Sequence, residues 1–308
     1  MFRGAFTALI TPLRRGASGQ LELDEAAIIA LVEQQIAAGI HGLVPCGTTG
    51  EAATLSVEEH LRVVELVVKT ARGRVPVLAG AGANNTDKAI ELARACKQLG
   101  ASGTLQVTPY YNKPTQAGLI AHFRAIAEAS DLPVVLYNVP GRTGCDLLPE
   151  TVAKLARDPR IVGIKDATAD MNRAARLREL LRERPDFSLL SGDDFTVFPF
   201  LALGGHGVIS VTSNVAPQWV AELCNAAAAG RWDEARALHD RHYPLARAMF
   251  TAPNPIPVKA AMALLGRCTG DMRLPLVALD PHSREGIALA DTLRGLGLLT
   301  TSASAAKA

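Results

Sequence analysis

Eight short apolar segments, most of them followed by a segment with helical periodicity, constrain the fold of this chain more than any other feature. They lie in the first two thirds of the sequence, at 4–11, 42–48, 75–82, 103–109, 132–139, 161–167, 187–192 and 207–212. Most are rich in Val, Ile and Leu without strict alternation, which is typical of parallel strands buried on both faces. The sequence therefore predicts an α/β protein built on a parallel sheet.

Helix start and stop signals stand between these strands. Asp24 is placed to cap a helix that ends at Gly39. Ser56 and Glu59 have the spacing of a capping box at the start of the next helix. Further helices are predicted over 87–99, 116–130, 149–157 and 172–183.

Strands that alternate with helices over about 220 residues fit a closed (β/α)8 TIM barrel better than an open doubly wound sheet. An open dinucleotide-binding sheet would need a glycine-rich turn after its first strand, where this chain has Thr11-Pro12-Leu13. After position 230 only helices are predicted, over 231–250, 257–265 and 283–296. We expect a barrel catalytic domain (1–230), a small C-terminal helical region (231–299) and a disordered tail (300–308).

The charge balance excludes several classes of protein. The formal net charge is only +2 in 308 residues, so no basic excess is available to follow a nucleic-acid backbone.

No stretch of about 20 apolar residues lacks charge, which argues against a membrane span, and the first apolar stretch is too short for a signal peptide. The five cysteines are scattered singly, which favours reduced thiols. We expect a cytoplasmic protein that binds neither nucleic acid nor membrane.

The histidines do not have the spacing of a metal site. Of the seven, His239 and His242 lie close together, in a helical segment without a carboxylate–cysteine cluster. We interpret them as two surface histidines and expect no bound metal. The acidic pair Asp193-Asp194 is expected to cap the following helix, because adjacent side chains diverge too much for paired carboxylate chemistry.

Lys165 is the strongest candidate for a reactive residue. Active sites of barrels lie where the strands end, and Lys165 is the only lysine that ends an apolar strand. Partial desolvation there disfavours the charged form and favours an amine able to form a Schiff base with a carbonyl. The alternative is a lysine that extends into solvent or pairs with Asp166.

Hydroxyl groups and one arginine stand at neighbouring strand ends. Tyr137, Thr48 and Tyr111 could relay the protons that imine formation requires; the alternative is that the tyrosines pack at the rim with their hydroxyls in water. Arg142, five residues after Tyr137, could clamp a carboxylate with two hydrogen bonds or could be a solvated loop residue.

Five motifs in the sequence are typical of one protein family. They are GTTGE at 47–51, PYYNKP at 109–114, YNVPGRTG at 137–144, IKDAT at 164–168 and SGDD at 191–194. With them the chain closely resembles the dihydrodipicolinate synthase family, which belongs to the pyruvate-dependent class I aldolases. The resemblance extends over nearly the whole chain, from Gly4 to Lys259.

The resemblance assigns roles to particular residues. It implies that Lys165 forms a Schiff base with pyruvate, and that Arg142 binds the carboxylate of L-aspartate-4-semialdehyde. The proton relay would consist of Tyr137, Thr48 and a Tyr111 donated across a dimer interface. Thr49 would hold the pyruvyl carboxylate, and the backbone of Gly192 and Ile209 would line the pyruvate pocket.

The resemblance also implies a reaction and an assembly. The family condenses pyruvate with L-aspartate-4-semialdehyde in the first committed step of diaminopimelate and lysine biosynthesis. No metal or organic cofactor is implied, because the covalent chemistry is carried by the lysine. Members are usually dimers of tight dimers, so we expect a homo-oligomer of at least two chains and a tetramer as the full assembly.

One departure from the family pattern concerns regulation. Feedback-inhibited relatives bind lysine at the dimer interface through positions that match Ala53, Val57, His60, Asn84, Lys88 and Tyr110. Lys88 stands where these relatives have a glutamate for the ligand's ammonium, and Val57 where they have histidine. Since like charges about 4 Å apart repel by about 1 kcal/mol even in water, we expect weak or no inhibition by L-lysine.

Three other functions remain open from the sequence. A 2-keto-3-deoxy-acid or N-acetylneuraminate-type pyruvate aldolase would use the same lysine and tyrosine and differ in the aldehyde, and Arg142 favours the synthase. A catalytically silent barrel would be expected to lack Lys165 or Tyr137. A phosphate-binding isomerase would need a glycine-rich turn after the last strand, where 212–215 reads TSNV.

Overall fold

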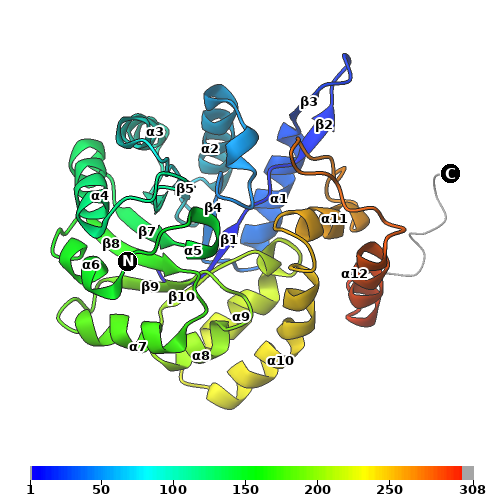
Figure 1. Cartoon of the computed structure of the whole chain (residues 1–308). Coiled ribbons are helices and arrows are strands. Elements are labelled where there is room, and N and C mark those ends of the chain that lie inside the picture. The colour runs from blue at the N-terminus through cyan, green and yellow to red at the C-terminus, as the bar shows by residue number, and fades with distance from the viewer. Residues whose placement is uncertain (1, 300–308) are drawn as a thin grey trace.

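The computed structural model describes residues 2–299, and a closed parallel sheet forms its centre (Figure 1). Eight strands pair side by side in the order β4-β1-β10-β9-β8-β7-β6-β5. A parallel bridge between Leu43 and Val77 joins the two ends of this order, so the sheet closes into a barrel. The predicted TIM barrel is confirmed.

Each strand lies inside one of the eight predicted apolar segments. The strands are β1 Gly4–Ala8, β4 Gly42–Val44, β5 Leu78–Gly80, β6 Gly103–Val107, β7 Val134–Asn138, β8 Ile161–Asp166, β9 Ser188–Ser191 and β10 Gly207–Ser210. They are shorter than the segments because the apolar residues continue into the loops at the strand ends.

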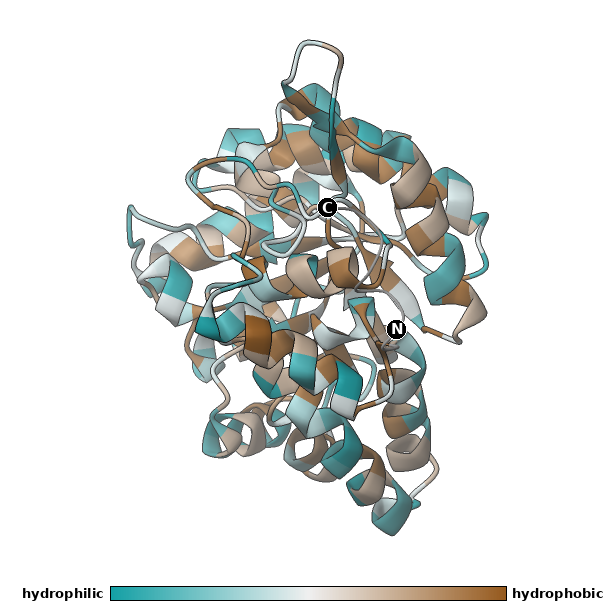
Figure 2. Cartoon of the chain, turned by 90° about the vertical axis from the view of Figure 1, so that its right-hand side faces the viewer, coloured by the Kyte–Doolittle hydropathy of each residue, from teal (hydrophilic) through white to brown (hydrophobic). Residues whose placement is uncertain are grey.

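A helix follows each barrel strand and covers the outside of the sheet. These helices are α1 Glu25–Ala37, α2 Val57–Ala71, α3 Thr86–Gln98, α4 Gln116–Ser130, α6 Pro149–Leu155, α7 Met171–Leu180, α8 Val197–Ala202 and α9 Pro217–Ala228. The predicted caps are present: Asp24 accepts from the amide of Ala27, and Ser56 and Glu59 form the capping box. Figure 2 shows hydrophilic and hydrophobic residues along single helices, as expected where one face packs and the other is wet.

Two helices, α5 (Pro140–Thr143) and α9, and one hairpin were not predicted, and α8 was expected after Asp193-Asp194 only without bounds. α8 is only six residues long and contains Pro199, α9 is alanine-rich and begins at a proline, and α5 is a single turn. The hairpin β2 (Leu13–Arg15) and β3 (Leu21–Leu23) projects beside α1 (Figure 1). It has no apolar run, because its outer positions carry the exposed ion pair of Arg14 and Glu22.

The C-terminal part is helical, as predicted, and packs on the barrel. It contains α10 (Trp232–Ala248), α11 (Ile256–Leu264) and α12 (Arg284–Gly295). α10 lies along α9, and α11 contacts the short 3-10 turn η2 (Thr212–Asn214) that follows β10. The domain boundary at 230 stays a prediction, and the predicted tail at 300–308 lies outside the described residues.

The core has two layers, one inside the barrel and one between strands and helices. Side chains such as Phe6, Leu105, Val135, Leu190 and Ile209 fill the barrel interior. The larger outer layer is formed by the inward faces of the helices and the outward faces of the strands. The barrel interior is therefore filled with side chains and is not a pore. Within residues 2–299, no helix is both long and apolar enough to cross a membrane.

Two predictions about single residues were wrong. His242 is not on the surface: its residue exposure is 0%, because its face of α10 packs inward, whereas His239 is half-buried. The pair Asp193-Asp194 does not cap α8. Asp193 accepts from the amide and hydroxyl of Thr196 in the turn before the helix, and Asp194 turns away to accept from backbone amides after β10.

Candidate active site

Lys165 and Tyr137 are paired residues on neighbouring strands. They lie opposite each other in the register of β8 and β7. The ammonium nitrogen of Lys165 is 4.2 Å from the centre of the Tyr137 ring, and each residue is only 7% exposed. Because side chains alternate along a strand, Ile164 packs in the outer layer and Lys165 points into the barrel. The two residues therefore meet at the base of the barrel mouth.

A cavity of about 240 Å³ opens above this pair. It is lined by six of the predicted catalytic and substrate-binding residues, namely Thr48, Thr49, Tyr137, Arg142, Lys165 and Gly192. A Cβ on residue 192 would lie 2.9 Å from Cε of Lys165, so glycine there makes room for the lysine. These residues come from the ends of four different strands and the loops that follow them, which the barrel brings to one place.

Two predicted residues lie outside this cavity. Ile209 is buried in the barrel interior, in the same apolar layer as Tyr137. Tyr111 is 90% exposed and, within the described chain, lines neither this cavity nor the one beside it. Its backbone is left-handed (φ 75°), and its amide donates to the carbonyl of Thr143. A single chain therefore leaves the third predicted relay group outside the cavity of Lys165.

Asn254, which sequence reasoning missed, connects two of the predicted substrate-binding residues. Its side-chain amide donates to the hydroxyl of Thr49 over 3.0 Å, and its backbone carbonyl accepts from Arg142 over 3.2 Å. Since the Thr49 oxygen accepts here, its own hydrogen is available to another acceptor. The only sequence signal was the proline-rich segment at 252–257, in which Asn254 lies.

Glu51 and Lys259 form a buried ion pair beside the cavity. Their side chains are 2% and 1% exposed, and Lys259 Nζ is 2.5 Å from Glu51 Oε1. Glu51 ends the loop that carries Thr48 and Thr49 and has a left-handed backbone (φ 55°). The pair joins this loop to α11, across 208 positions of sequence.

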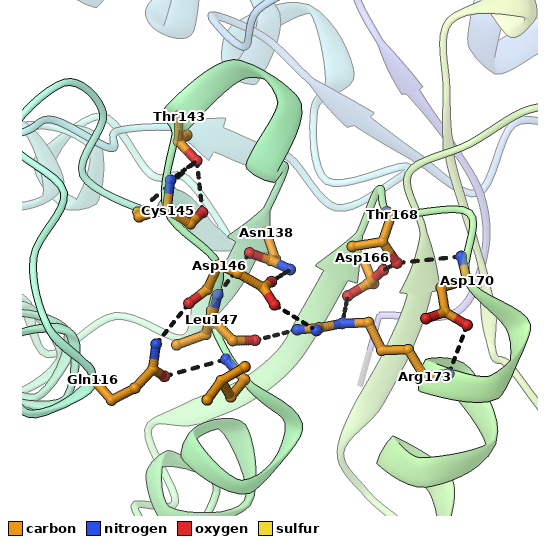
Figure 3. A network of polar contacts seen from close by, with 11 residues as sticks. Gln116, Asn138, Thr143, Cys145, Asp146, Leu147, Asp166, Thr168, Asp170 and Arg173 are labelled. Atoms are coloured by element: carbon orange, nitrogen blue, oxygen red, sulfur yellow. Dashed lines mark hydrogen bonds and ion pairs between the residues drawn. The ribbon is translucent and has the colours of Figure 1, made fainter.

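Asp166 does not pair with Lys165, which removes that alternative. Its side chain points out of the barrel, where Oδ2 accepts from Arg173 Nε over 2.7 Å and Oδ1 accepts from Thr168 (Figure 3). Arg173 also binds Asp146 and the carbonyl of Leu147. This network fixes the end of β8 from outside the barrel. Asp166 therefore pairs with Arg173, and Lys165 on the inner side forms no ion pair with Asp166.

The predicted regulatory residues are divided between two environments. Ala53, His60 and Tyr110 line a second cavity of about 480 Å³, which shares Thr48, Tyr137 and Arg142 with the first. His60 Nε2 lies 2.8 Å from the carbonyl of Gly80, and burial lowers the pKa of His60. The other three residues, Val57, Asn84 and Lys88, line neither cavity; Lys88 is exposed in the first turn of α3.

Comparisons with known proteins agree on one family. The family model described as "Dihydrodipicolinate synthetase family" matches residues 1–292. A 4-hydroxy-tetrahydrodipicolinate synthase of Hyphomonas neptunium is 54% identical over 296 residues, which is 96% of this chain and 99% of that protein.

Solved structures of the same kind superpose closely. A chloride-inhibited dihydrodipicolinate synthase of Acinetobacter baumannii, complexed with pyruvate, is 43% identical and has a TM-score of 0.93, covering 97% of this chain and 100% of that one. An enzyme of the same name from Cyanidioschyzon merolae, with lysine bound, is 41% identical and has a TM-score of 0.91, covering 97% and 99%.

Proposed function

Because the chain belongs to the dihydrodipicolinate synthetase family and catalyses the 4-hydroxy-tetrahydrodipicolinate synthase reaction, we propose that the cavity around Lys165 is its active site. One observation carries this proposal: Lys165 and Tyr137 are register partners, and Lys165 Nζ lies 4.2 Å from the centre of the Tyr137 ring. Both line the same cavity as the residues proposed to bind substrate. The proposed substrates are pyruvate and L-aspartate-4-semialdehyde, with no metal or organic cofactor.

The first half of the proposed mechanism joins pyruvate to the enzyme. Lys165 Nζ attacks the keto carbon of pyruvate, and Tyr137 supplies the proton with which the keto oxygen leaves as water. No carboxylate within residues 2–299 forms an ion pair with Lys165, so none holds its nitrogen away from the carbonyl. The Thr49 hydroxyl, already oriented by Asn254, donates to the pyruvyl carboxylate.

The second half forms the carbon–carbon bond and releases the product. Loss of a proton from the methyl group gives an enamine, whose carbon attacks the aldehyde of the second substrate. The amine of that substrate then attacks the imine carbon, displaces Lys165 and closes the ring. One water is released overall and the lysine is regenerated. Arg142, which lines the cavity, binds the carboxylate of L-aspartate-4-semialdehyde through bidentate hydrogen bonds.

The relay requires a second copy of the chain. Tyr111 is 90% exposed and does not line the cavity of its own chain, which supports its insertion into the active site of a neighbouring protomer. We therefore propose a homo-oligomer of at least two chains, with a tetramer as the full assembly.

A coupled assay tests the substrates and the nucleophile together. Consumption of L-aspartate-4-semialdehyde in the presence of pyruvate is followed through a reductase by loss of NADPH, and Lys165→Ala is expected to abolish it. Lys154→Ala, which alters a lysine of α6 away from the cavity, is the matched control.

Trapping with borohydride separates the outcomes. Reduction in the presence of pyruvate is expected to fix a covalent adduct on wild type and on Lys154→Ala, but not on Lys165→Ala. An inactive wild type that still traps pyruvate would keep the imine chemistry and overturn the aldehyde, in favour of a sugar-acid aldolase. A Lys165→Ala variant that still traps pyruvate would overturn the nucleophile.

A further inference from the structure

Two buried ionisable side chains face each other on the side of the barrel where β9 and β10 end. Asp194 lies in the loop after β9, and His242 lies in the middle of α10. Their side chains are 1% and 0% exposed, and His242 Nε2 is 3.8 Å from Asp194 Oδ1. The reaction proposed above uses neither of them.

Asp194 connects two walls of the active-site cavity. Its other oxygen, Oδ2, accepts from the amides of Val211 over 2.8 Å and Thr212 over 3.1 Å, immediately after β10. Val211 lines the cavity of Lys165, and so does Gly192, which precedes Asp194 by two residues. One carboxylate thus fixes the loop after β9 to the end of β10, the two segments that carry the residues predicted to line the pyruvate pocket.

The remaining oxygen of Asp194 needs a donor. No atom of the described chain forms a hydrogen bond with Oδ1, and both ring nitrogens of His242 also have no partner there. An unpaired buried carboxylate oxygen is costly. Burial lowers the pKa of His242, so its ring is neutral near pH 7 and carries one N–H. The other titratable groups around the pair are Asp193 beside Asp194, His239 on α10 and Cys224 on α9, and none of them forms a hydrogen bond with the Asp194 side chain.

The separation of 3.8 Å is longer than a hydrogen bond, and a shift of less than 1 Å closes it. We propose that His242 and Asp194 form a buried positioning pair: Nε2–H of His242 orients the Asp194 carboxylate, which holds the ends of β9 and β10 at the spacing that pyruvate binding requires. The inference rests on the proposed function, since pyruvate is the ligand whose pocket these strand ends form. Arg142 follows β7, so the aldehyde site is not held by this pair.

Substitutions at both positions separate positioning from simple packing. Asp194→Ala removes the acceptor of two amides and is expected to raise the KM for pyruvate about tenfold or more, with the KM for the aldehyde unchanged. Asp194→Asn keeps an oxygen for the amides and is expected to restore most of the affinity. His242→Leu removes the donor and is expected to raise the KM for pyruvate several-fold, whereas His242→Gln keeps an N–H and is expected to rescue it.

The neighbouring histidine gives the control. His239 lies on the same helix, half-buried and stacked on Phe198, and His239→Leu is expected to leave both KM values unchanged. A pyruvate KM for His242→Leu equal to that of wild type, or an equal rise in both KM values, would overturn the proposal. If Asp194→Ala does not fold, the His242 variants decide alone. Absence of turnover or pyruvate trapping in wild type would instead be a failure of the proposed function.

Discussion

Replacing Lys259 by methionine tests how strongly the stability of the chain depends on the buried ion pair between Lys259 and Glu51, the residue that ends the loop of Thr48 and Thr49. Methionine keeps an unbranched side chain of similar length, replaces the δ-methylene by sulfur and removes the ammonium group. Glu51 Oε1 then loses its partner, and within residues 2–299 its Oε2 has none to begin with. The substitution therefore leaves a whole carboxylate buried without compensation.

The size of the effect follows from the burial of the pair. Exposed ion pairs contribute about 0–1 kcal/mol, whereas breaking a buried pair by removing one partner costs about 3–5 kcal/mol. With side chains 1% and 2% exposed, Lys259 and Glu51 belong to the second class. We expect Lys259→Met to lower the free energy of unfolding by about 3 kcal/mol or more. The double variant Glu51→Gln/Lys259→Met is expected to recover about half or more of that loss, since it buries no unpaired charge.

Urea denaturation at one fixed protomer concentration measures these differences. The matched control is Arg14→Met, which breaks the 2.8 Å pair with Glu22, where both side chains are more than 40% exposed; it is expected to cost less than about 1 kcal/mol. Because Glu51 closes the loop of Thr48 and Thr49, Lys259→Met is also expected to raise the KM for pyruvate. A cost below about 1 kcal/mol, or strictly additive effects of the two substitutions, would refute the reasoning.

Three further predictions concern the second substrate, regulation and pH. Arg142→Ala is expected to raise the KM for L-aspartate-4-semialdehyde about tenfold or more with little change for pyruvate, because a charged hydrogen bond to a carboxylate is lost; steady-state kinetics with each substrate varied in turn test this. L-lysine is expected to inhibit weakly or not at all, because Lys88 is exposed at the position where feedback-inhibited relatives are expected to have a glutamate, and its charge would repel the ammonium of the ligand. Inhibition below millimolar concentration would contradict this. Burial lowers the pKa of His122 from 6.5 to about 4, so its contribution to stability is complete above pH 6.5 and is lost as the pH falls toward 4. That contribution amounts to about 3 kcal/mol, and His122→Gln is expected to flatten the pH dependence of urea midpoints between pH 7 and 4.

The barrel could be predicted because its strands are buried on both faces. A strand such as β7 has only buried residues, and the resulting apolar run stands out from any sequence context. The hairpin of β2 and β3 is the opposite case: its six positions include Arg14, Arg15 and Glu22, and its strands are held by pairing with each other. Short elements that bury little apolar surface leave no such pattern.

The site could be predicted at strand ends and not elsewhere. Lys165 and Tyr137 were found because each ends an apolar run, and strand order places them together. Asn254 lines the cavity and Lys259 binds Glu51 beside it, and both lie more than 200 positions away from their partners, Thr49 and Glu51. The burial of His242 was not predicted, because its four neighbours at 239–241 and 243 are polar or aromatic and the segment has no apolar pattern. Only position 242 of this turn is fully buried.

These misses share one cause, and it bears on how the chain is organised. Three residues beyond position 230 contact the strand ends through polar groups: Asn254 binds Thr49, Lys259 neutralises Glu51, and His242 faces Asp194. A barrel cut at 230 would retain Lys165 and Tyr137 but would leave the Glu51 carboxylate without its partner, Asp194 without the facing His242, and Thr49 without its donor. Buried charge without compensation is among the most destabilising features that a protein can contain. The helical region therefore supplies polar partners to the loops around the candidate active site.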